Sequence, residues 1–144
     1  MKFLAIIIVG SMIAALGAAA QEPGKSDEDK IVGTWSVVSF VKQGKKGPDE
    51  AVEKFSVTFD KAGNLLFSDG DKKMELTYKL DAAKSPKEID LNEDEKGIVH
   101  KGIYVFDGDN LKICSAYPPL ERPTEFVSPE GENIGLIVLK RAKK

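Results

Sequence analysis

Strict alternation of apolar and polar residues constrains the fold of this sequence more than any other feature. In KFSVTFD, residues 54–60, the apolar side chains Phe55, Val57 and Phe59 share one parity and the polar side chains share the other. KMELTYKL, residues 73–80, repeats the pattern. A period of two is typical of an antiparallel strand with one solvated face, because helical spacing would mix the two sets.

Short turn sequences separate the alternating segments. DKAGN, SDGDK and DGDN each combine glycine, which adopts positive φ, with Asp or Asn, which tolerate it. Three such turns in succession indicate consecutive hairpins. The predicted strands cover residues 33–42, 54–60, 64–68, 73–80, 87–91, 98–106, 110–115 and 134–141.

Eight antiparallel strands with one apolar parity favour an all-β, closed up-and-down barrel, because closure removes exposed sheet edges. A β-sandwich is the alternative, and it would need longer crossing connections than most of those present. Closure places the first strand beside the last. Gly33 and Trp35 would then lie next to Arg141, with a cation–π contact of about 0.5–2 kcal/mol between the latter two.

The first 20 residues are typical of a cleaved secretory signal peptide. Lys2 precedes an apolar run that ends in three alanines, and the expected cleavage site lies before Gln21. An uncleaved membrane anchor is the alternative. We therefore predict an exported, periplasmic or extracellular protein with no membrane span after cleavage. A flexible leader, residues 21–30, would end in one helical turn and lead into a single domain, residues 31–144.

Charge and cysteine content exclude several classes of protein. Cleavage leaves 20 basic and 23 acidic residues, a net charge of about −3, which is not the electrostatic footprint of a nucleic-acid-binding protein. Cys114 is the only cysteine, so an intramolecular disulfide is impossible. We expect it to be a small strand residue of a monomer, with pairing between chains or metal binding as alternatives.

The longest predicted connection, residues 116–133, contains four prolines. Loops of this length are usually functional or disordered, but Tyr117 and Phe126 indicate that this one packs against the domain. Arg122, between two prolines, would either offer its guanidinium to an acidic partner or form a structural pair with Glu121 or Glu125 or at the barrel mouth.

Two levels of family resemblance agree with the predicted fold. Gly33 and Trp35 after a helical turn, with Arg141 closing the last strand, resemble the first signature of the lipocalin and fatty-acid-binding superfamily. The whole mature chain is similar to a family of small exported bacterial domains, expanded in planctomycetes, whose function is uncharacterised. The matching segments are IVGTWSVVS, FSVTF, KEIDL, GIYVFDGDNLKIC, RPTEF and LIVLKR. The resemblance implies a lipocalin-like barrel and supplies no catalytic residues. The chain also lacks the Arg-x-Tyr pair with which fatty-acid-binding proteins hold a carboxylate.

Catalytic and metal-binding motifs are not evident. His100 is the only histidine, and a strand histidine is usually a rim or core residue. The sequence has no Gly-x-Ser-x-Gly elbow and no Cys-x-x-Cys motif. Acidic clusters at residues 92–95 and 107–110 lack EF-hand spacing and are explained by a loop and a hairpin turn. We expect no enzymatic activity, metal or cofactor.

Two binding functions therefore remain open. In the first, a small apolar or amphipathic ligand binds at the barrel mouth beneath the long loop. The candidate ligand-binding residues are Tyr78, His100, Tyr104, Tyr117, Arg122 and Phe126. In the second, the barrel is filled and its loops contact another extracytoplasmic protein or the cell envelope. An interior cavity below about 300 Å³ would argue against the first.

Overall fold

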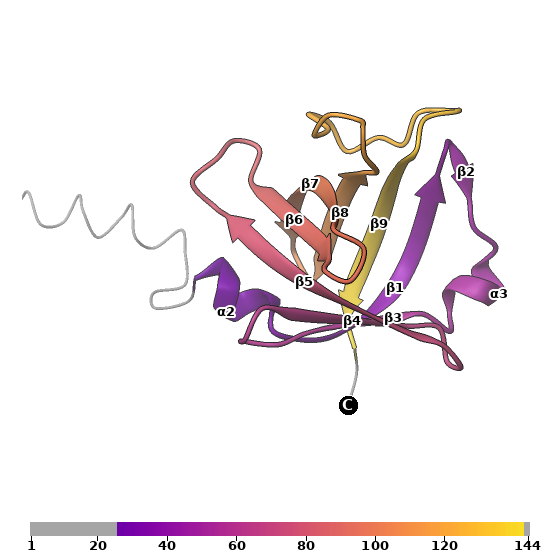
Figure 1. The fold of residues 1–144 in the computed structure, drawn as a ribbon. Coiled ribbons are helices and arrows are strands. Elements are labelled where there is room, and N and C mark those ends of the chain that lie inside the picture. Colours follow the sequence, from indigo (N-terminus) through magenta and orange to yellow (C-terminus); the bar gives the residue numbers. More distant parts are fainter. Residues whose placement is uncertain (1–25, 143–144) are drawn as a thin grey trace, which may run out of the picture.

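A computed structural model describes residues 26–142, which form a closed antiparallel β-barrel with two short helices (Figure 1). The elements are α2 (Asp27–Ile31), β1 (Gly33–Lys42), β2 (Lys45–Lys46), α3 (Asp49–Val52), β3 (Ser56–Phe59), β4 (Asn64–Ser68), β5 (Lys73–Asp81), β6 (Glu88–Glu93), β7 (Ile98–Asp107), β8 (Asn110–Ala116) and β9 (Ile134–Arg141). The expected signal peptide lies outside the described residues, as do residues 21–25 of the leader.

Ring closure is the defining feature of the sheet. From β3 to β9 each strand pairs with the next one along the chain, and β1 pairs with both β3 and β9. The predicted eight-stranded barrel is therefore confirmed, and the β-sandwich alternative is wrong. Trp35 lies opposite Arg141 in the register, as closure requires.

The segment between β1 and β3 differs from the prediction. The sequence pattern predicts no helix or strand there, but β2 extends a hairpin from β1, and α3 follows Pro48. Val52 of α3 is buried, and the Val37 N–H donates to the Phe55 carbonyl at 3.3 Å. This segment therefore packs beside the part of β1 that follows residue 36, where the pairing of β1 with β3 ends.

The inward-facing residues follow the predicted parity. Aromatic and branched side chains from all eight barrel strands form one core, which includes Trp35, Val57, Phe59, Leu65, Ile89, Tyr104, Leu111, Ile113 and Leu139. Met74 is the exception among the residues expected inside, because it lies near the end of β5 and is 48 % exposed. Alternation thus predicts which face a side chain occupies, but not how deep it lies.

The two ends of the barrel differ. At the closed end, α2 packs against the core with Asp27 and Ile31 buried, and the Trp35 Nε1–H donates to the Ile31 carbonyl at 2.9 Å. The helical turn expected before the first strand is therefore present as α2, but it packs against the core, so the folded domain begins before residue 31. At the opposite, open end, the barrel meets the β6–β7 turn and the long loop, residues 117–133 (Figure 1).

Ser26 caps α2, since its Oγ accepts from the Asp29 N–H at 3.2 Å, which is the spacing expected from the sequence. Within residues 26–142, no helix is long and apolar enough to span a membrane.

Candidate functional site

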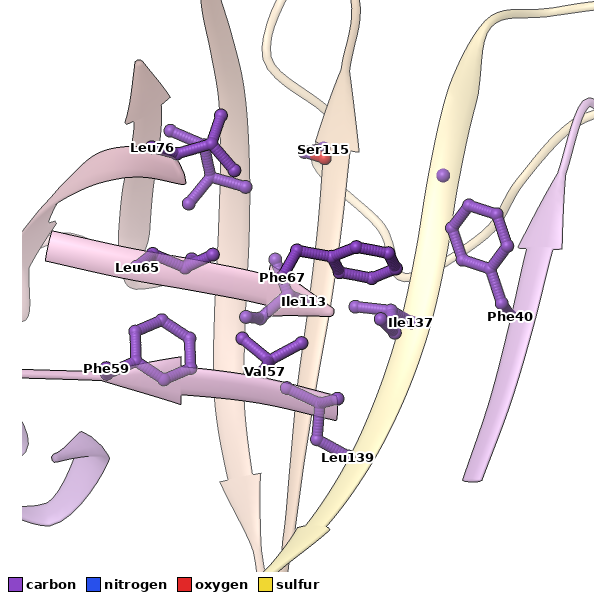
Figure 2. A pocket seen from close by; sticks show the side chains of 12 residues that line it. Phe40, Val57, Phe59, Leu65, Phe67, Leu76, Ile113, Ser115, Ile137 and Leu139 are labelled. Atoms are coloured by element: carbon purple, nitrogen blue, oxygen red, sulfur yellow. The ribbon is translucent and has the colours of Figure 1, made fainter. Parts of the chain in front are cut away.

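An apolar hollow of about 140 Å³ lies inside the barrel (Figure 2). We call it the cup. Its lining comes from seven strands of the wall and comprises Phe40, Val57, Phe59, Leu65, Phe67, Leu76, Leu91, Ile113, Ser115, Gly135, Ile137 and Leu139. Among these described lining residues, Ser115 alone has a polar side chain. The cup is therefore suited to an apolar group rather than to an ion.

Small residues on the inner face leave room for the cup. Gly102, Ser115 and Gly135 pair with one another across β7, β8 and β9. One layer deeper, the corresponding residues are large, and Ile113 pairs with Ile137. Because the side chains are large at one level of the wall and small at the next, the space next to the small side chains stays unfilled.

The size of the cup limits what it can enclose. Its volume lies below the roughly 300 Å³ at which small-molecule pockets usually begin. A complete ligand of that class therefore does not fit inside the barrel. A cavity of about 150 Å³ lined by Leu, Ile and Phe can nevertheless bind benzene. The cup accordingly admits one aromatic ring or one short alkyl group.

Three polar side chains lie on the inner face near the open end. His100 pairs with Leu91, which lines the cup, and Glu93 follows Leu91 by two residues on the same strand. The His100 Nε2 lies 2.6 Å from the Glu93 Oε2. The Tyr117 ring meets the His100 ring edge-on, with centroids 5.0 Å apart. The structure thus brings together two of the predicted ligand-binding residues, His100 and Tyr117.

Tyr78 and Tyr104 lie towards the other end of the barrel. The Tyr78 hydroxyl donates to the Asp60 carbonyl at 2.7 Å, and the Tyr104 hydroxyl donates to Asp27 Oδ2 at the same distance. Burial and this bond to Asp27 raise the pKa of Tyr104. Both hydroxyls are therefore engaged at the closed end, away from the polar residues of the mouth.

Asp27 is the buried centre of the closed end. Its Oδ2 also accepts from Lys87 Nζ at 2.8 Å. Burial alone would raise the pKa of Asp27, but the bonds from Lys87 and Tyr104 outweigh it and lower the pKa below its usual value. These contacts attach α2 to strand β7 and to the start of β6, and they have a structural role.

Arg122 contacts the outside of the barrel wall. Its Nη1–H donates to the Gly102 carbonyl at 2.9 Å and lies 2.8 Å from Asp90 Oδ1, while its Nε lies 3.5 Å from Glu88 Oε1. The expected pairing with Glu121 or Glu125 is wrong, because the outward carboxylates of β6 lie within reach. The guanidinium thus joins the long loop to β6 and β7.

Other contacts of the long loop also lie on the outer wall. Ile103 and Cys114 are buried although their parity points away from the interior core. The Cys114 thiol lies 3.5 Å from the Val127 carbonyl, and burial raises the pKa of Cys114. No residue of the described loop lines the cup, and Phe126 is half-buried within it. The expected lid over the cup is therefore not formed.

Glu93 is the residue near the cup that the sequence analysis missed. Ile89 lies in the core and Leu91 lines the cup, so the period of two also places Glu93 on the inner face. A carboxylate at an apolar parity is the signal that could have identified it.

Comparison with protein-family models, curated proteins and solved structures gives no match for this chain. The resemblance to exported bacterial domains therefore stays a prediction, and the case for function depends on the geometry of the site.

Proposed function

We propose that this protein binds small amphipathic ligands by enclosing one apolar group, a single ring or a short alkyl chain, in the cup. The observation that carries the proposal is the apolar hollow of about 140 Å³ beside the polar residues of the open end. The remainder of the ligand extends through that end. This narrows the ligand hypothesis drawn from the sequence to ligands of which only a part is buried.

The expected affinity for an isolated ring is low. Burial of one apolar side chain of this size contributes about 1.5–3 kcal/mol, and small ligands reach a somewhat higher free energy per atom. A Kd of about 1 mM corresponds to about 4 kcal/mol and is the magnitude we expect for toluene. Contacts made by a polar head group at the mouth would add to it.

A second candidate function is a binding module that contacts another protein through its outer surface. The small volume of the cup favours it, since most of the barrel interior is filled. Val127 also favours it, because this side chain lies in the long loop and is 52 % exposed. Under this hypothesis the cup is a packing defect without a ligand.

Titration of the protein with toluene, followed by NMR chemical shifts of backbone amides, distinguishes the two functions. Ser115→Leu places a larger side chain in the cup. Ser36→Leu makes the same change at an exposed position of β1 and serves as the matched control. We expect binding by the wild type and by the control variant, and at least a tenfold weaker affinity in Ser115→Leu.

Equal affinity in all three proteins would show that toluene binds elsewhere and would overturn the proposal. Absence of any shift in the wild type up to the solubility limit of toluene would favour the filled binding module.

A further inference from the structure

A second, larger hollow adjoins the cup. It has a volume of about 720 Å³ and is open to solvent. Its lining comes from β5, the last residue of β6 and the β6–β7 turn, with one residue of β4, and comprises Asn64, Lys73, Met74, Glu75, Leu76, Thr77, Glu93, Asp94, Glu95 and Lys96. Leu76 lines both hollows, so the two hollows meet at this side chain. We call the second hollow the side groove.

The side groove exists because β5 and β6 separate at the open end. Their pairing begins at Thr77 and Asn92, so residues 73–76 of β5 pair with β4 on one side only. The β6–β7 turn therefore stands apart from the upper part of β5. Between β6 and residues 73–76 of β5 the wall of the barrel therefore has no strand pairing.

The charged groups of the side groove are mainly acidic. Four carboxylates, those of Glu75, Glu93, Asp94 and Glu95, face two lysines, Lys73 and Lys96. The net charge of the lining is therefore −2.

Two of these carboxylates are held in place. Glu93 lies 2.6 Å from His100 and 3.9 Å from Lys96, and Asp94 Oδ2 accepts from the Thr77 hydroxyl at 3.1 Å. The carboxylates of Glu93 and Asp94 therefore have defined positions in the side groove. The two hollows define the site, and these charges determine which head group it prefers.

We propose that the ligand is a cationic amphiphile, whose ring or short alkyl group occupies the cup and whose ammonium group lies among the carboxylates of the side groove. The inference rests on the proposed function, since it requires an occupied cup. A carboxylate head group would face four like charges at the same place.

Three probes with the same ring test this inference: 2-phenylethylamine, 2-phenylethanol and phenylacetate, each titrated by NMR as for toluene. We expect the amine to bind tightest and the carboxylate weakest. Because a partly exposed ion pair stabilises a complex only weakly, we expect the amine to bind about fivefold more tightly than the alcohol. In 1 M salt the preference should fall towards one, because the Debye length is then about 3 Å.

Glu75→Gln removes an exposed carboxylate of the side groove, and Glu121→Gln is a matched control in the long loop. We expect the amine preference to fall about twofold in Glu75→Gln and further in Glu75→Gln/Glu93→Gln, with no change in the control variant. Toluene affinity should be the same in the wild type, Glu75→Gln and Glu121→Gln.

The possible results separate the two proposals. Equal binding of amine and alcohol, or tightest binding of phenylacetate, would overturn the cationic ligand while toluene binding still supports the cup. An amine preference that is equally reduced by Glu121→Gln would assign it to overall charge and overturn the side groove. Failure of toluene and of all three probes would overturn the proposed function and this inference together.

Discussion

Removal of a single hydroxyl group at the closed end tests how α2 is attached to the barrel. Tyr104→Phe leaves the ring in the core but deletes the O–H that donates to Asp27 Oδ2 at 2.7 Å. Tyr104 is 1 % exposed and Asp27 is 9 % exposed, so water cannot easily replace the lost donor. Lys87 remains as the other partner of the carboxylate.

The expected loss of stability follows from the charge and burial of this bond. A hydrogen bond to a charged group contributes about 1.5–3 kcal/mol to the free energy of unfolding. We expect Tyr104→Phe to lose about 2 kcal/mol at pH 7. For a domain of this size that corresponds to a decrease in Tm of about 8 °C. Urea denaturation and thermal melting measure the two quantities independently.

The stability lost in Tyr104→Phe should also depend on pH. The pKa of Asp27 is lower in the folded protein than its ordinary value of 3.8, so its contribution to stability is present above that value and is lost as the pH falls through the folded pKa. The stability difference between wild type and Tyr104→Phe should therefore be constant from pH 7 to about 5 and should narrow below about pH 4.

Tyr78→Phe is the matched control, since the Tyr78 hydroxyl donates to a neutral carbonyl at the same distance of 2.7 Å in a more exposed setting. A loss of about 0.5–1.5 kcal/mol without dependence on acidic pH is expected there. Equal losses in the two variants, or a Tyr104→Phe loss unchanged at pH 3, would refute the buried, charged nature of the Asp27 contact.

Two further predictions concern ring closure and the long loop. Gly33 has φ of +129°, and an added Cβ would lie 2.6 Å from Arg141 Nη1, whereas Gly70 has φ of +102° with open space around it. In urea denaturation Gly33→Ala should therefore lose at least about 1 kcal/mol more than Gly70→Ala, and equal losses would contradict the contact with Arg141. Arg122→Ala should expose Cys114 and accelerate its alkylation under native conditions at least tenfold, measured with iodoacetamide; an unchanged rate would show that the loop stays in place without the guanidinium.

The strands were predictable because the alternation of side chains is local. Six of the eight predicted strands match the structure within one residue at each end, including β1, β4 and β9, and the parity correctly assigned the interior. Arg141 lies over the Trp35 ring at 4.0 Å and donates to the Val32 carbonyl at 2.8 Å. Closure was therefore predictable from strand number and direction alone.

Other features depend on contacts that a period of two does not encode. Asp27 meets Lys87 across 60 positions of sequence, and Arg122 reaches β6 rather than its own neighbours. The β2–α3 segment was missed because elements of two and four residues are too short to show a period. The cup depends on side-chain volume at one level of the wall, which parity alone does not give.

Intermolecular nuclear Overhauser effects between toluene and the methyl groups of the protein show whether an apolar group occupies the cup. Occupation of the cup predicts strong effects to Leu76, Ile113 and Ile137, which line it (Figure 2). Effects confined to Ile103 and Val127 on the outer wall, or none at saturating toluene, would contradict it.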